Sequence, residues 1–202
     1  KFAAACGIPR LVSISSRHVY GQKGLTRCVR EASPLLPESA YGRAKLFAEE
    51  KLNSFLTRLG MDVIIARAFN HTGPGQLPPL MFAQWCEQLT TGKKPLAIYN
   101  DNTFLDLSDV RDVVRAYRLL AIHGQSAQAY NVGSGKTIRT GDLAQQLVDY
   151  ASPGCPIESQ SHEEQHLPLA DIDKLQALTG WRPEIPLGKT IADSWAFWLE
   201  RL

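Results

Sequence analysis

The sequence predicts an α/β protein with a parallel sheet and a smaller α+β lobe. The first third of the chain alternates strand, helix and strand: an apolar, β-branched run at 11–16, a helical stripe at 41–59 and a second apolar run at 62–68. Strands joined by a helix in this order pair in parallel through a right-handed crossover. The chain has 202 residues, of which 44% are hydrophobic, so it can bury one sizeable core or two small ones.

Each element of this first unit has its own signal. Residues 1–10 read as the last turns of a helix that Gly7 ends, and the run LVSISS that follows is typical of a strand buried on both faces. Ser39 suits the N-cap of the next helix, which Gly60 ends. The apolar stripe of this helix consists of Leu46, Leu52, Phe55, Leu56 and Leu59.

The pattern becomes looser after a Gly/Pro-rich loop that follows Asn70. We expect helices at 80–91, 108–123, 140–150, 171–178 and 189–202, and strands at 96–99, at 129–132 and shortly after Pro153. Two lobes follow from this order. Residues 1–75 belong with the parallel sheet, to which 108–133 return, while 76–107 and 134–202 form the smaller lobe.

Composition excludes several classes of protein. Lys and Arg number 22 against 20 Asp and Glu, which gives a net charge of +2 and does not favour a nucleic-acid or membrane-surface partner. The four cysteines form no CxxC pair, and no run reaches the roughly 18 apolar residues of a membrane helix. We therefore expect a cytoplasmic protein with reduced thiols. Residues 162–166 match HExxH, but they lie in a polar loop ended by proline, so we expect no metal site.

The most informative local pattern is Tyr41 followed four residues later by Lys45. This spacing places a phenol and an ammonium on one helix face, where the cation would lower the pKa of Tyr41 towards the working range of an acid/base group. Ser16 ends a buried parallel strand, where open α/β sheets bind ligands, so its hydroxyl is a third candidate. A solvated Tyr–Lys pair and a serine that satisfies loop backbone are the alternatives.

These residues occur within a larger set of ordered motifs. The chain resembles the extended short-chain dehydrogenase/reductase family, also called the NAD-dependent epimerase/dehydratase family. The matching segments are 15–21 (SSRHVYG), 31–34 (EASP), 39–45 (SAYGRAK), 67–76 (RAFNHTGPGQ), 106–114 (DLSDVRDVV), 130–135 (YNVGSG) and 180–183 (GWRP). The resemblance implies a partial Rossmann-like sheet and an enzyme that binds NAD or NADP and a nucleotide-diphosphate sugar.

The resemblance also implies roles for single residues. Tyr41 would be the acid/base on a sugar oxygen, Ser16 would share that oxygen, and Lys45 would bind the nicotinamide ribose. Phe69 and Asn70 would border the nicotinamide, and Asn70 would also bind substrate. For Asn70 alone, a turn-forming asparagine is the competing interpretation.

The expected reaction follows from the residues after Ser16. Dehydratases of the family carry acidic residues there, whereas this chain has Arg17 and His18, so dehydration is disfavoured. The segment 69–76 looks most like the GDP-4-keto-6-deoxy-mannose reductases, which predicts reduction of a GDP-4-keto-6-deoxy sugar. A nucleotide-sugar 4-epimerase is the alternative, and an inactive nucleotide-sugar-binding homologue or fragment is the non-enzyme alternative. The oligomeric state stays open, with a homodimer as one expectation.

Two departures from the family pattern affect binding. Leu105 stands where the family often has an arginine that contacts the nucleotide sugar; Arg111, which we take as substrate-binding, Arg115 or Lys93 could replace it, although each also suits a solvated charge. No GxxGxxG sequence occurs in the chain. We therefore expect that the N-terminal dinucleotide-binding part, about one hundred residues in a domain of normal size, lies outside this chain.

Overall fold

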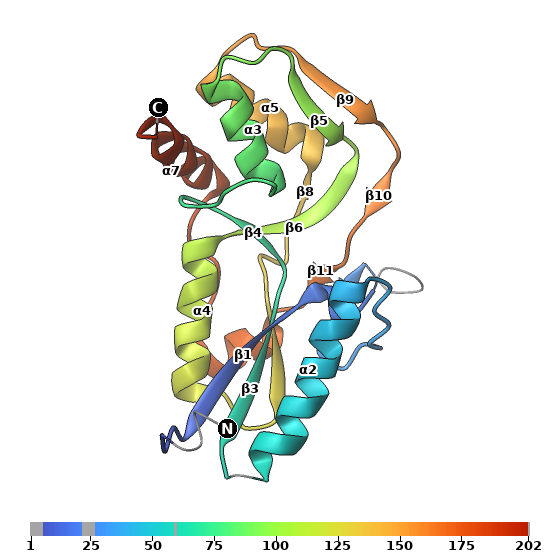
Figure 1. The fold of residues 1–202 in the computed structure, drawn as a ribbon, viewed down its shortest axis with the longest axis vertical. Coiled ribbons are helices and arrows are strands. Elements are labelled where there is room, and N and C mark those ends of the chain that lie inside the picture. Colours follow the sequence, from blue (N-terminus) through green and yellow to red (C-terminus); the bar gives the residue numbers. More distant parts are fainter. Residues whose placement is uncertain (1–5, 22–26, 59, 202) are drawn as a thin grey trace.

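The protein is elongated, with a parallel sheet at one end and a helical cluster at the other (Figure 1). A computed structural model describes residues 6–21, 27–58 and 60–201, apart from the side chains of 53 and 55–57. The helix expected at 1–10 lies largely outside the described residues, as does Leu59 in the expected stripe of the next helix. None of the helices in the described part is long and apolar enough to span a membrane.

The sheet contains three parallel strands in the order β1 (Arg10–Ser16), β3 (Asp62–Ala68) and β7 (Gln128–Val132). Helix α2 (Ala40–Thr57) connects β1 to β3, which confirms the predicted strand–helix–strand unit. Helices α2 and α4 (Val110–His123) flank the sheet on opposite sides (Figure 1). Ser16 lies opposite Ala68 in the register, so the carboxyl ends of β1 and β3 meet at one edge.

Strand β3 is buried on both faces, as its apolar sequence predicts. Val63 and Ile65 pack with Leu52 of α2. Ile64 and Ala66 pack on the other face, in a cluster that contains Val113, Ala116 and Leu120 of α4. Successive residues of β3 thus supply the cores on the two sides of the sheet.

Helix starts show where local sequence signals succeeded and where they did not. Ser39 is an N-cap as predicted, because its hydroxyl accepts a bond from the Gly42 amide at 3.0 Å. The helix expected from Ser108 begins two residues later, and its cap is Asp109, whose carboxylate accepts from the Arg111 amide. Ser108 lies in β6 (Thr103–Asp109), a strand that the sequence analysis missed.

The far end of the molecule is built from short strands and three helices. β6 pairs with β4 (Asn70–Thr72), β8 (Thr137–Arg139) and β10 (Gln165–His166), and β5 (Leu96–Asn100) pairs with β9 (Ile157–Ser161). Helices α3 (Met81–Thr90), α5 (Thr140–Ala151) and α7 (Leu187–Leu199) gather beside β5 and β9 (Figure 1) and share one apolar core. α7 was expected at 189–202 and begins earlier, directly after Pro186.

Residues 169–181 return to the parallel sheet, which the sequence pattern did not predict. β11 (Leu169–Ala170) pairs with β2 (Cys28–Val29), and α6 (Asp173–Thr179) follows it. Leu175 and Trp181 are buried with residues of β3, α4 and β7. Residues 169–181 therefore cover the sheet rather than the helical cluster.

Candidate active site

A cavity of about 580 Å³ opens where the carboxyl ends of β1 and β3 face β6 and α3. Four of the six predicted site residues line it: Ser16, Tyr41, Phe69 and Asn70. Residues from η1 (Arg17–Val19), the 3-10 turn that follows β1, also line it, as do residues of β4 and β5. The cavity lies at the edge of the sheet where open α/β proteins bind ligands.

Ser16 is the last residue of β1 and its side chain is buried against the cavity. Its hydroxyl oxygen accepts a bond from the His18 amide at 3.3 Å and so caps η1. Ser16 thus satisfies a backbone amide of the following turn, as the alternative interpretation predicts. The hydroxyl hydrogen is not used by that bond, so Ser16 can still donate to a ligand oxygen in the cavity.

Tyr41 and Lys45 share one face of α2, as their spacing predicts. Tyr41 is 54% exposed, and Lys45 Nζ lies 5.7 Å from the centroid of the Tyr41 ring. Lys45 Nζ also donates to the Ile14 carbonyl at 2.9 Å, which fixes the amine beside the end of β1. Lys45 does not line the cavity itself. Tyr41 therefore lines the cavity, and the amine of Lys45 lies beside its ring.

The close contact between α2 and η1 depends on a glycine. A Cβ atom on Gly42 would lie 2.4 Å from the His18 carbonyl oxygen, closer than any real contact. This approach brings the His18 ring edge-on to Tyr41, with centroids 5.6 Å apart. Gly42 thus sets the position of Tyr41 relative to the turn that follows Ser16.

A buried polar network supports the site from behind. Glu49, four residues after Lys45, forms an ion pair with Arg67 of β3 at 2.8 Å, and both side chains are at most 6% exposed. Burial opposes the charge of Arg67, but its bonds to Glu49 and Tyr20 outweigh burial and raise its pKa. The Ser15 hydroxyl donates to Glu49, so the network joins α2, β1 and β3. The sequence analysis missed Glu49, although it continues the spacing of four from Tyr41.

Asn70 is held in a fixed orientation at the cavity wall. Its Nδ2 donates to the Asp106 carbonyl at 3.1 Å, and its Oδ1 accepts from Arg17 Nε at 3.3 Å. Asn70 belongs to β4 and pairs with Leu107 of β6, so it is not a turn residue. Its amide group is thereby presented to the cavity by two strands.

The segment 133–136 is the turn that joins β7 to β8, and Asp106 holds it. One oxygen of this buried carboxylate accepts from the amide and hydroxyl of Ser134, and the other from the amides of Gly135 and Ala170. Burial raises the pKa of Asp106, and these bonds act in the opposite direction. The Asp106 side chain therefore joins β6 to the turn and to β11.

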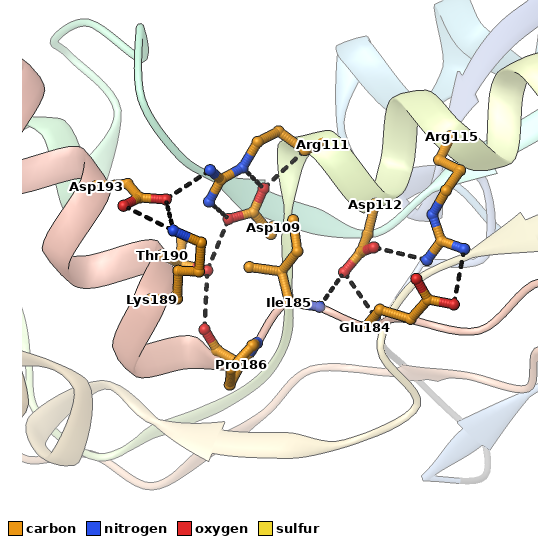
Figure 2. A network of polar contacts seen from close by, with 10 residues as sticks. All are labelled: Asp109, Arg111, Asp112, Arg115, Glu184, Ile185, Pro186, Lys189, Thr190 and Asp193. Atoms are coloured by element: carbon orange, nitrogen blue, oxygen red, sulfur yellow. Dashed lines mark hydrogen bonds and ion pairs between the residues drawn. The ribbon is translucent and has the colours of Figure 1, made fainter.

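The structure does not bring Arg111 to the cavity, contrary to the role expected for it. Figure 2 shows its guanidinium between Asp109, at 2.7 Å, and Asp193, at 2.6 Å. Burial alone would raise the pKa of Asp109, but the bonds from Arg111 and Thr190 outweigh burial and lower it. Arg111 is thus occupied in joining α4 to α7, a pairing between distant segments that the sequence does not reveal.

The other candidate cations are also outside the cavity. Arg115 pairs with Asp112 and Glu184, and Lys93 is exposed after α3. Within the ranges that the structure describes, no three His, Cys, Asp or Glu side chains are grouped so as to hold a metal ion. In the HExxH segment, His162 bonds to Asp101 and His166 bonds to Glu164.

Comparisons with known proteins agree with this geometry. The profile of the NAD dependent epimerase/dehydratase family matches residues 1–133. GDP-6-deoxy-D-mannose reductase of Pseudomonas aeruginosa is 30% identical over 199 residues, which cover 94% of this chain and 66% of that protein. A trifunctional UDP-glucose 4,6-dehydratase/UDP-4-keto-6-deoxy-D-glucose 3,5-epimerase/UDP-4-keto-L-rhamnose-reductase of Arabidopsis thaliana is 31% identical over 87% of this chain and 27% of its own length.

A solved structure has a similar fold. The solved structure of RMD from Pseudomonas aeruginosa, complexed with NADPH, superposes with a TM-score of 0.89 at 30% identity, covering 98% of this chain and 69% of that one. The chain thus spans about two thirds of the bacterial reductase and about a quarter of the plant protein. The match over 1–133 contains Ser16, Tyr41, Lys45 and Asn70. The chain belongs to the NAD dependent epimerase/dehydratase family.

Proposed function

We propose that the natural protein transfers hydride between NAD or NADP and a sugar carbon of a nucleotide-diphosphate sugar, and that it reduces a GDP-4-keto-6-deoxy sugar at C4. The observation that carries this proposal is the placement of Ser16 and Tyr41 on the wall of one cavity, with Lys45 beside Tyr41. The likeness to a GDP-6-deoxy-D-mannose reductase supports the choice of sugar. Residues 76–107 and 134–168 supply much of the remaining wall, in agreement with a substrate-binding lobe.

Tyr41, Ser16 and Asn70 have separate roles in the proposed reaction. Reduction adds a hydride to the carbonyl carbon and a proton to its oxygen. Tyr41 donates the proton from its phenol, and the Ser16 hydroxyl donates a hydrogen bond to the same oxygen, which stabilises the charge that develops there. Asn70 orients the substrate through the amide group that β4 and β6 hold in place.

The residues present fit the nicotinamide-ribose end of the cofactor. The nicotinamide supplies the hydride when it is bound. Lys45 uses one of its three donors on the Ile14 carbonyl, which leaves two for ribose hydroxyls. Phe69 is buried at the cavity wall and can border an aromatic ring. No residue of this chain is assigned to the pyrophosphate end, because its usual GxxGxxG loop does not occur in the sequence.

The test is turnover of the natural protein with a GDP-4-keto-6-deoxy sugar and reduced nicotinamide cofactor. Stoichiometric loss of nicotinamide absorbance supports the reductase. Unchanged absorbance together with a C4-inverted product from a UDP-hexose would contradict the reductase and support a 4-epimerase.

Tyr41→Phe tests the role of the phenol. Loss of a general acid should lower turnover about 100- to 10,000-fold, with sugar-nucleotide affinity nearly unchanged. Tyr150→Phe is the matched control, because Tyr150 is exposed on α5 and does not line the cavity. Wild-type turnover in the Tyr41 variant contradicts the proposed chemistry.

A further inference from the structure

The wall of the cavity carries one formal charge. Among the described residues that line it there is no Asp or Glu, and Arg17 is the only Lys or Arg. Two histidines, His18 and His71, also line it. Burial and the nearby Arg17 both lower the pKa of His18, which favours its neutral form near neutral pH. The cavity therefore presents an isolated cation to whatever enters it.

Arg17 is unusual because it is charged, buried and bound by little else. Arg17 is 5% exposed, and its Nε donates to Asn70 Oδ1 at 3.3 Å. This is the only side-chain hydrogen bond that Arg17 makes to the described residues, although a guanidinium has five donors. Burial lowers the pKa of Arg17, as expected for a charge removed from water without a close partner.

The carboxylate whose field acts on Arg17, that of Asp106, does not satisfy this charge. Asp106 raises the pKa of Arg17 through its field, but both Asp106 oxygens already accept two bonds each from the backbone and Ser134. Leu105, beside Asp106, is buried and apolar and also lines the cavity. A buried unpaired charge is unfavourable, so a ligand that supplies the missing anion would bind strongly here.

We propose that Arg17 binds an oxyanion group of the substrate, the diphosphate of the nucleotide sugar. The inference rests on the proposed function and deepens it by naming the residue that recognises the anion. A guanidinium held by its Nε keeps two terminal nitrogens in a fork, which matches the paired oxygens of a phosphate or a carboxylate. Asn70 then acts as a positioning residue, because its Oδ1 fixes the plane of that fork.

The test measures ligand affinity by titration calorimetry on the natural protein, independently of turnover. The ligands are GDP and UDP, with guanosine and uridine as phosphate-free controls, and UDP-glucuronate compared with UDP-glucose. The variants are Arg17→Gln and Arg17→Lys. Lys93→Met is the matched control, because it removes one positive charge from an exposed position outside the cavity.

Arg17→Gln should weaken the binding of GDP or UDP, whichever the wild-type protein prefers, about 10- to 100-fold. The affinity for the corresponding nucleoside should stay unchanged. Weaker binding of UDP-glucuronate alone would assign Arg17 to a sugar carboxylate and would overturn the inference. Arg17→Lys should recover part of the lost affinity. Lys93→Met should bind all ligands with the wild-type affinities.

Three further results would overturn the inference: all affinities of Arg17→Gln within twofold of wild type, equal weakening of nucleosides and diphosphates, or wild-type protein that binds diphosphates no more tightly than nucleosides. Should Arg17→Gln not fold, Arg17→Lys and the wild-type comparison decide the question. Because Tyr41→Phe is judged by turnover and Arg17→Gln by affinity, failure of this inference is distinguishable from failure of the proposed function.

Discussion

Removal of the Glu49 carboxylate should destabilise the protein strongly, because it leaves Arg67 as a buried charge without its carboxylate partner. Three bonds join Arg67 to Glu49, at 2.8, 3.1 and 3.3 Å, and the two side chains are 6% and 5% exposed. Breaking a buried pair by truncating one partner costs about 3–5 kcal/mol. We expect Glu49→Ala to lower the free energy of unfolding by that amount. Glu49→Gln should lower it less, since its carbonyl oxygen can still accept from Arg67.

Urea unfolding monitored by tryptophan fluorescence measures the effect. With a denaturant slope of about 2 kcal/mol per molar for a chain of this size, a loss of 3–5 kcal/mol moves the midpoint by about 1.5–2.5 M. Asp62→Ala is the control, because Asp62 of β3 pairs with Arg10 of β1 at 2.9 Å but is 43% exposed. That variant should move the midpoint far less. A shift below about 0.5 M for Glu49→Ala, at an unchanged slope, would refute the importance of the buried pair.

Three further substitutions follow from the same structure. Gly42→Ala should lower both melting temperature and turnover, although alanine favours helices, because its Cβ would collide with the His18 carbonyl; an unchanged melting temperature would contradict the close contact. Asp106→Asn turns one acceptor of two amide bonds into a donor and should cost about 2–4 kcal/mol in urea unfolding. Asp109 has a lowered pKa, so its stabilisation is complete above its ordinary value of 3.8 and is lost as pH falls through the folded value. The stability difference between wild type and Asp109→Asn should therefore shrink below about pH 4; a constant difference would exclude this titration.

The parallel sheet was predictable because its signals are local. The apolar runs of β1 and β3, the cap at Ser39 and the stop at Gly60 each depend on a few neighbouring residues, and the structure has the strands at 10–16 and 62–68. β6 was missed because its residues alternate only weakly in polarity and continue directly into α4. Its place is decided by pairing with β4, β8 and β10, which are distant in sequence.

The candidate site was predictable where spacing alone brings residues together. Tyr41 and Lys45 share a helix face, and Ser16 ends a strand, so their positions follow from secondary structure. Arg111 could not be placed in this way, because its partner Asp193 lies 82 residues further along the chain. Arg17 was noticed only as the absence of an acid. Its burial depends on β4 and β6, which close over the end of β1.

The spacing of four residues continues beyond the Tyr–Lys pair, and this continuation explains how a half-exposed tyrosine keeps its position. Tyr41, Lys45 and Glu49 lie on successive turns of one helix face, and the last two bond to consecutive residues of β1, Ile14 and Ser15. Ser16 comes next in that strand. The distance between the phenol and the Ser16 hydroxyl is therefore set by a helix fixed to a strand at two points, in addition to the contact of Gly42 with η1. Glu49→Gln should accordingly lower turnover more than it lowers sugar-nucleotide affinity, because it loosens this alignment without touching the ligand; equal losses in both quantities would show that Glu49 serves stability alone.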